Sequence, residues 1–283
     1  MSQDLPLSGV RVVSVAVNLP GPLAAARLCE LGAEVIKVEP PTGDPLASMA
    51  PQWYQDLASG QTVVRLDLKS AEQRAAFEIE LSWADVLITA MRPSASARLG
   101  LDKLPQQFPA LSLVEIVGHD GEFVEVPGHD LTYQAAHGTL TPPTMPTVPV
   151  ADVVGAERAV SAALLALMGR ARTGRGECRR IVLEEAAADA GAAVRYGLMG
   201  PGTPLGGAIP SYGIYASADG HVALGALEPH FRDRALALLG AKHRQDQLAS
   251  AFVTRTTADW EGLAADADIP LVGIYMQAKG EPA

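Results

Sequence analysis

The sequence is poor in cysteine and in long apolar runs, and each shortage excludes a class of protein. Only Cys29 and Cys178 are present, without the close spacing of metal ligands, so neither a disulfide framework nor a metal site is expected. No apolar stretch approaches the roughly 20 residues of a membrane-spanning helix. The first ten residues lack the basic and then apolar pattern of a signal peptide, so we expect a cytoplasmic protein without a membrane partner.

Positive charge is also scarce. The chain has 22 Lys and Arg against 32 Asp and Glu, which gives a net charge of −10. A broad basic surface for nucleic acid is therefore not expected, although a few locally placed cations are enough to bind an anionic ligand. Hydrophobic residues make up 48% of the 283 positions, which is typical of a globular protein that buries a sizeable core.

Strand and helix patterns alternate through the first two thirds of the chain. Predicted strands lie at 10–17, 35–38, 66–68, 84–88, 111–117 and 180–183, and predicted helices lie at 23–31, 70–82, 155–170 and 184–196. This alternation predicts an α/β fold, in which an open, Rossmann-like parallel sheet is covered by helices on both faces. Ligands of such sheets bind beyond the carboxyl ends of the strands.

The chain is predicted to form a large domain at 1–199 and a second, smaller domain at 200–283. The segments 141–149 and 200–213 are rich in Pro and Gly, which makes them candidate linkers or active-site loops. The turn after the first strand, NLPGP at 18–22, lacks the G-x-G-x-x-G spacing. Binding of NAD or FAD is therefore not expected.

Asp152 is the leading candidate for a catalytic carboxylate. It follows the apolar residues 148–151 and precedes a predicted helix whose first turn lies near Gly155. Partial desolvation there would raise its pKa and suit it to act as a base or nucleophile. The alternative is a purely structural role, because acidic residues often cap the start of a helix.

The segment PGHDLTYQAAHG at 127–138 contains further candidates. His129 is able to exchange protons near neutral pH, and its alternative is a plain loop histidine. Asp130 is predicted to cap the helix that follows, and Tyr133 falls one turn later.

Three other ionisable residues have weaker patterns. Glu228 lies directly before Pro229, where a helix is predicted to begin, so it is either a capping residue or part of the site. His119 and His137 show no partner pattern and are interpreted as structural or exposed.

Several segments together resemble, in the correct order, the family III CoA-transferases, which include α-methylacyl-CoA racemases and carnitine CoA-transferases. The resemblance extends from about residue 7 to 240 and is carried by residues 18–45, 66–70, 84–101, 127–138, 170–186 and 215–231. It implies an acyl-CoA or CoA substrate, no tightly bound cofactor, and a homodimer of interlocked chains.

The resemblance also implies roles for the candidate residues. Asp152 aligns with a carboxylate that attacks the acyl-CoA carbonyl in the transferases and acts as one of two bases in the racemases. His129 matches the second base, and Asp130, Tyr133 and Glu228 match positions that orient the histidine or complete its network. The presence of His129 and Glu228 with Asp152 favours a racemase-like site, with CoA transfer through an Asp152 anhydride as the close alternative.

This sequence departs from the family pattern where family members hold the CoA phosphates. No Arg follows the GDP segment at 43–51, and polar or cationic positions are lost before the LDLK sequence. The predicted CoA-binding residues that remain are Lys37, Arg92, Arg98, Pro20 and Gly21. The chain also ends earlier than family members, which predicts a trimmed small domain. A further alternative is therefore a non-catalytic partner subunit with a degenerate CoA site.

Overall fold

The computed structural model describes residues 5–275, and the chain divides into two compact units, Met1–Gly191 and Ala192–Ala283. The division falls at Gly191, before the expected boundary at 199, so residues 192–199 belong with the second unit. Each unit has its own sheet and its own hydrophobic core.

The first unit is built on a six-stranded sheet with the order β3-β2-β1-β4-β5-β6, and every neighbouring pair is parallel. Its strands are β1 (Arg11–Ser14), β2 (Glu34–Glu39), β3 (Thr62–Arg65), β4 (Val86–Ala90), β5 (Ser112–Val117) and β6 (Cys178–Val182). This order confirms the predicted Rossmann-like sheet. The strand order reverses between β1 and β4, and such a switch point is where open α/β sheets bind ligands.

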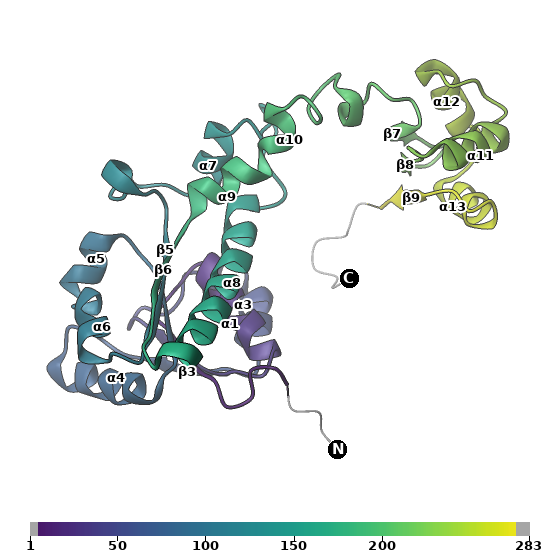
Figure 1. Ribbon diagram of the computed structural model, residues 1–283. Helices are drawn as coiled ribbons and strands as arrows, with labels where there is room; N and C mark the ends of the chain where they lie inside the picture. Colours follow the sequence, from purple (N-terminus) through teal and green to yellow (C-terminus); the bar gives the residue numbers. More distant parts are fainter. Residues whose placement is uncertain (1–4, 276–283) are drawn as a thin grey trace. The chain divides into compact units, whose positions relative to one another are not determined.

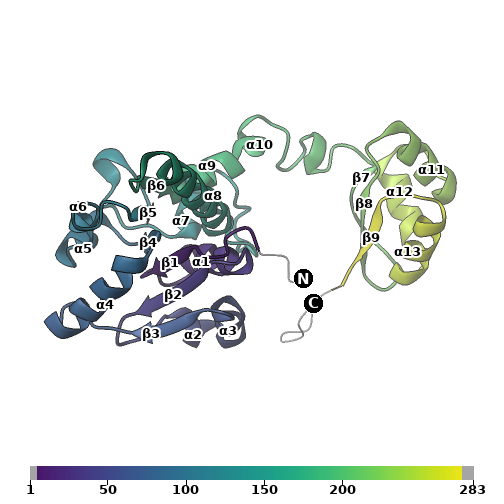
Figure 2. The same cartoon turned by 60° about the horizontal axis from the view of Figure 1, so that its bottom comes forward.

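Helices cover both faces of this sheet (Figures 1 and 2). One face carries α1 (Pro20–Glu30), α7 (Asp130–Ala136), α8 (Val150–Thr173) and α9 (Leu183–Ala190), and the other carries α4 (Ala71–Trp83), α5 (Pro93–Arg98) and α6 (Leu104–Gln107). Successive side chains of a strand point to opposite faces. Val12 of β1 therefore packs into the core beside α1 and α8, whereas Val13 packs into the core beside α4.

Small residues let α8 lie close to its neighbours. Ala159 and Ala163 are fully buried on its inner face, where they belong to the same core cluster as Ala24 and Ala25 of α1. Gly155 faces α9, because a Cβ at this glycine would lie 2.3 Å from Leu183 Cδ2. This close packing fixes the start of α8, and with it Asp152, against the sheet.

Several element boundaries differ from the sequence prediction. The third strand is 62–65 and not 66–68, and α8 begins at Val150, five residues before the predicted start at 155. Val150 and Ala151, directly before Asp152, thus begin this helix after Pro149 and do not belong to a strand. The predicted helix 184–196 is broken after α9, and α10 (Ala192–Arg195) follows.

Short elements complete the connections of the first unit. They are α2 (Leu46–Met49), α3 (Pro51–Ala58) and the 3-10 turns Leu101–Lys103 and Gly121–Phe123.

The second unit contains a three-stranded antiparallel sheet in the order β7-β8-β9. Its elements are a 3-10 turn at Pro204–Gly206, strands β7 (Tyr212–Ala216), β8 (His221–Gly225) and β9 (Leu271–Ile274), and helices α11 (Pro229–Leu239), α12 (Gln245–Phe252) and α13 (Thr257–Asp266). Stacked and edge-on contacts join Tyr215, Phe252 and Trp260 in its core. Across residues 5–275, no helix has both the length and the apolar character needed to cross a membrane.

Candidate active site

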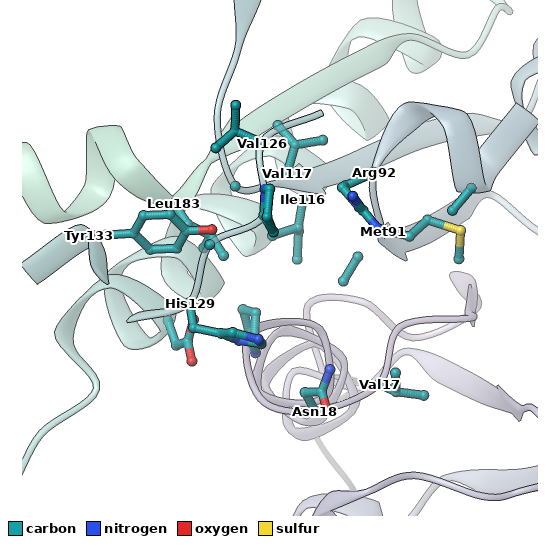
Figure 3. A pocket seen from close by; sticks show the side chains of 17 residues that line it. Val17, Asn18, Met91, Arg92, Ile116, Val117, Val126, His129, Tyr133 and Leu183 are labelled. Carbon is teal, nitrogen blue, oxygen red and sulfur yellow. The ribbon is translucent and has the colours of Figure 1, made fainter. Parts of the chain in front are cut away.

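A cavity of about 420 Å³ lies at the carboxyl ends of four strands of the large sheet. Its wall includes Asn18 after β1, Arg92 after β4, Gly118 after β5 and Leu183 after β6. In Figure 3, Tyr133 and His129 face Met91 and Arg92 across this cavity. The cavity thus occupies the switch point between β1 and β4, where the fold favours a ligand.

The structure brings five of the candidate residues to this one cavity. They are Asp152, His129, Tyr133, Arg92 and Pro20. Asp152 comes from the first turn of α8, and His129 directly precedes α7, so two ionisable groups reach the cavity from different segments of the chain.

Asp152 is half-buried in the cavity wall. Burial, which penalises the charged form, and repulsion from the nearby Asp130 carboxylate raise the pKa of Asp152 to about 6. A carboxyl with this pKa populates both protonation states near neutral pH. It is therefore suited to acid and base chemistry as well as to nucleophilic attack.

Asp130 caps a helix, but it is not the helix that the sequence predicted. Its Oδ1 accepts a hydrogen bond from the Ala151 backbone N–H at 2.7 Å, at the start of α8, and its Oδ2 accepts one from the Gln134 side chain at 2.6 Å. The residue that precedes α7 is His129, whose backbone N–H donates to the Thr132 hydroxyl at 3.0 Å. The His129 imidazole is left exposed on the cavity side.

Tyr133 is almost completely buried, with 2% of its surface exposed, and its hydroxyl end fits between two glycines. A Cβ on Gly118 would lie 2.3 Å from the hydroxyl oxygen, and a Cβ on Gly128 would lie 2.6 Å from it. Burial, followed by the negative charges of Asp152, Glu184 and Asp130, raises the pKa of Tyr133 to about 12. The phenol therefore stays protonated at neutral pH.

His119 does have a partner, which the sequence did not indicate, and His137 lies near the same carboxylate. The Glu184 carboxylate lies 2.6 Å from His119 Nδ1 and 3.6 Å from His137 Nε2. The His119 ring also meets the Tyr133 ring edge-on, with ring centroids 5.2 Å apart. No local pattern reveals this group, because Glu184 is 65 positions from His119 and only the fold brings them together.

Lys37 does not fit its predicted contact with a phosphate group. It is 2% exposed, and its ammonium lies 2.6 Å from the Asp44 carboxylate and 3.1 Å from that of Glu39. Asp44 in turn accepts from the Asn18 backbone N–H at 3.0 Å. Lys37 therefore supports the turn after β1 from inside the protein.

Gly21 and Arg98 lie outside the wall of the cavity. A Cβ at Gly21 would lie 2.1 Å from Ala16 Cβ, so this glycine permits close packing of α1 on the end of β1. Arg98 is exposed at the end of α5. Their predicted CoA contacts stay predictions.

The exposed side chain of Arg92 lies at the cavity wall beside an acidic neighbour. Its guanidinium donates to the backbone carbonyl of Glu125 at 3.3 Å. The Glu125 carboxylate accepts two hydrogen bonds from Ser94, one from its N–H and one from its hydroxyl, both at 2.7 Å. The Ser94 hydroxyl, together with the charges of Arg92 and Arg98, holds the pKa of Glu125 below its usual value.

A second cavity, of about 440 Å³, adjoins the first, because Val17 and Met91 line both. It extends over the carboxyl ends of β1 and β2 and includes the exposed Lys69. Sequence analysis missed Lys69 as a binding candidate, although it lies in the LDLKS segment on which the family resemblance partly rests.

Glu228 belongs to the second unit, where it is exposed and directly precedes α11. The helix predicted to begin at Pro229 is confirmed. The role of Glu228 in the site stays a prediction.

The fold and the site define an α/β protein with an acid–base cavity at the switch point of a Rossmann-like sheet. The chain belongs to CoA-transferase family III, whose family model matches residues 7–278. It is 31% identical over 279 residues to an alpha-methylacyl-CoA racemase of Mus musculus, an alignment that covers 90% of this chain and 68% of the relative. It is 27% identical over 315 residues to a cinnamoyl-CoA:phenyllactate CoA-transferase of Clostridium sporogenes, covering 93% and 76%.

Among solved structures, a CAIB/BAIF family protein from Brucella suis superposes with a TM-score of 0.80 at 25% identity, over 97% of this chain and 85% of that one. These findings confirm the resemblance seen in the sequence. Both racemases and CoA-transferases occur among the relatives. The comparisons therefore show the family, whose members act on CoA thioesters, and do not select one of these two activities.

Proposed function

We propose that this protein moves the α-proton of an acyl-CoA thioester, with Asp152 and His129 as the two acid–base groups. The supporting observation is that these two side chains line one cavity and come from different segments, Asp152 from the first turn of α8 and His129 from the residue before α7. Inversion at a carbon atom needs one group that removes a proton and another that returns it from the opposite face. The Asp152 pKa of about 6 suits this exchange near neutral pH.

In the forward step, the ionised Asp152 takes the α-proton. The C–H electron pair forms a C=C bond, and the π pair of the thioester C=O moves onto the oxygen to give an enolate. A protonated His129 then delivers a proton to the other face, and the C=O bond forms again. The step needs a hydrogen-bond donor at the thioester oxygen, where the negative charge develops.

The two adjoining cavities suit an elongated substrate. A ligand that crosses Val17 and Met91 would place one end beside Asp152 and the other end near Lys69. An acyl-CoA has this shape, with a reactive thioester at one end and phosphate groups toward the other. Arg92 and Lys69 are the cations along this path.

CoA transfer is the second candidate, because the same half-buried carboxylate is suited to attack. In that reaction an Asp152 oxygen bonds to the thioester carbon, the C–S bond breaks, and CoA leaves as a thiolate. The thiolate then attacks the resulting anhydride to give an enzyme-bound CoA thioester and a free acid.

A test of exchange separates these reactions. The protein is incubated in D2O with a 2-methylacyl-CoA of one configuration, and deuterium is expected at the α-carbon and inversion in the product. Asp152→Asn and His129→Ala should each lose this exchange. A transferase would instead show the mass of bound CoA on Asp152, and a non-catalytic subunit would show neither result.

A homodimer of interlocked chains is a separate proposal, which rests on the family resemblance. Light scattering after size-exclusion chromatography tests it, and a mass near one chain, 29.6 kDa, would exclude it.

A further inference from the structure

We infer that Tyr133 is a catalytic residue whose hydroxyl donates a hydrogen bond to the thioester carbonyl oxygen, and that the His119–Glu184 pair holds its ring in position. The inference rests on the proposed function, because it needs an acyl thioester as the ligand. It holds for proton transfer and for CoA transfer alike, since both place negative charge on that oxygen.

Two backbone donors beside the Asp152 side chain are already in use. The first N–H groups of α8 would be the natural donors to an oxyanion beside Asp152. However, the N–H groups of Ala151 and Asp152 both donate to Asp130 Oδ1, at 2.7 and 3.4 Å. A side-chain donor on the cavity wall can serve in place of these two groups.

The Tyr133 hydroxyl is such a donor. It lines the cavity together with Asp152, and within residues 5–275 it makes no hydrogen bond to the protein. Figure 3 shows the phenol oxygen directed toward the cavity, beside Val117. Asn18, another uncharged donor on the wall, is exposed, whereas Tyr133 is fixed in the slot between Gly118 and Gly128.

The protonation state of Tyr133 fits this role. Its pKa of about 12 keeps the hydroxyl protonated throughout the pH range in which Asp152 titrates. The negative charge of Asp152 contributes to that pKa, so the two groups lie close enough to interact.

The residues around Tyr133 hold its ring in a fixed position. The His119 ring meets the Tyr133 ring at an interplanar angle of 80°, and His119 Nδ1 lies 2.6 Å from Glu184 Oε2. The Glu184 backbone N–H donates to the Gly118 carbonyl at 3.0 Å, so Glu184 is tied to the strand end that forms the slot. His119 and Glu184 are thus positioning residues, which act through Tyr133.

The electron balance is the same in outline for both reactions. In proton transfer, the π pair of C=O moves onto the oxygen as the α C–H pair becomes a C=C bond. In CoA transfer, that pair moves onto the oxygen as Asp152 bonds to the carbon, and it returns as the C–S bond breaks. Tyr133 keeps its proton in both cases, and its hydrogen bond strengthens as the oxygen gains charge.

The decisive variant is Tyr133→Phe, which keeps the ring in its slot and removes only the hydroxyl. The loss of one preorganised donor lowers kcat by roughly 100-fold to 1,000-fold in comparable sites. We expect such a fall in kcat with little change in KM. Tyr215→Phe is the matched control, because it removes another buried phenol hydroxyl, which donates to Pro210 in the second unit. It should leave kcat unchanged.

A spectroscopic measurement makes the test independent of turnover. The C=O stretch of a bound, carbonyl-labelled thioester analogue should move to higher frequency in Tyr133→Phe than in the wild type. His119→Phe keeps an aromatic contact but loses the bond to Glu184, and it should produce a smaller shift in the same direction.

The outcomes separate this inference from the proposed function. Wild-type kcat and an unshifted carbonyl band in Tyr133→Phe would overturn the role of Tyr133 and leave the proposed function intact. If Asp152→Asn instead retained full turnover, the proposed function itself would fail, and this inference with it.

Discussion

One oxygen of the Asp130 carboxylate accepts the backbone N–H of Asp152 at 3.4 Å, and the charge of the same carboxylate helps to raise the pKa of the Asp152 side chain. Asp130 therefore combines two functions. It anchors the first turn of α8, and it makes its neighbour easier to protonate. A neutral side chain of the same shape separates these effects, because it keeps an acceptor oxygen and loses the charge.

Asp130→Asn should lower the pKa of Asp152 below about 6 while the fold is retained, because repulsion between the two carboxylates is removed. The low-pH limb of the activity profile should move to lower pH. Asp130→Ala should in addition lower the free energy of unfolding by about 1 kcal/mol, since α8 loses its cap. Urea unfolding and pH–rate profiles of both variants test this, and an unmoved profile in Asp130→Asn would contradict it.

Asp152 should make the protein less stable as the pH rises. Its pKa is about 6 in the folded protein against a usual value of 3.8, so the folded state binds the proton more tightly. The stabilisation that comes from this tighter proton binding is complete below pH 3.8, and it is lost as the pH rises through about 6. At neutral pH, ionisation of the Asp152 carboxyl lowers the free energy of unfolding by on the order of 2 kcal/mol.

The neutral variant Asp152→Asn should consequently be more stable than the wild type at about pH 7.5 and equal to it near pH 4. Thermal or urea unfolding at the two pH values measures this difference. The same difference at both values would mean that desolvation does not perturb Asp152.

The sequence was sufficient to predict the sheet, and its candidates Asp152, His129 and Tyr133 lie at one cavity, where their catalytic roles stay predictions. Buried strands such as 111–117 have a strong local pattern, and four of the six predicted strands lie within two residues of the observed bounds. The start of α8 was misjudged because Val148–Ala151 has the composition of a strand, whereas Asp130, distant in sequence, caps a helix there. Local propensity does not contain that contact.

Contacts between charged residues that are far apart in the sequence could not be predicted, for the same reason. Lys37 lies in a segment that resembles a CoA-binding one, but its charge is satisfied inside the protein by Asp44 and Glu39. His119 and His137 showed no pattern, because Glu184 meets them only after β6 has joined the sheet. In each case the residue type suggested a chemical role, and its contacts in the folded protein determined whether the side chain was available to a ligand.

Lys37→Met should destabilise the protein by about 3–5 kcal/mol, because it leaves the buried Asp44 carboxylate without its cation and leaves buried Glu39 with the more distant, exposed Arg65 at 3.8 Å. Urea unfolding measures the loss. Arg11→Met removes an exposed ion pair with Glu34 and is the matched control, with an expected change below about 1 kcal/mol. Equal effects of the two variants would contradict the assignment of Lys37 to the interior.

Lys69→Met should weaken the binding of CoA thioesters without loss of stability, because Lys69 is exposed at the second cavity. The loss of one charge-assisted contact predicts about a tenfold rise in Kd. Acyl-pantetheine, which lacks the nucleotide, serves as the comparison ligand, and its affinity should be the same for variant and wild type. If both ligands lost affinity equally, the nucleotide end would not lie at Lys69.

Glu125 should weaken the binding of an anionic ligand at the mouth of the first cavity. Its carboxylate is held by Ser94, and its charge interacts with Arg92 in the cavity wall and with Arg98 at the end of α5. Glu125→Gln should therefore bind CoA a few times more tightly than the wild type in low salt, and the gain should shrink as salt screens the charges.

Glu122→Gln is the matched control for Glu125→Gln, because Glu122 is an exposed residue of the same loop and loses the same charge. Its affinity for CoA should equal that of the wild type. Calorimetric titration at two salt concentrations measures all three proteins. Equal gains in both variants would assign the effect to overall charge, whereas a gain confined to Glu125→Gln would assign it to competition between the Glu125 carboxylate and the ligand for Arg92 and Arg98.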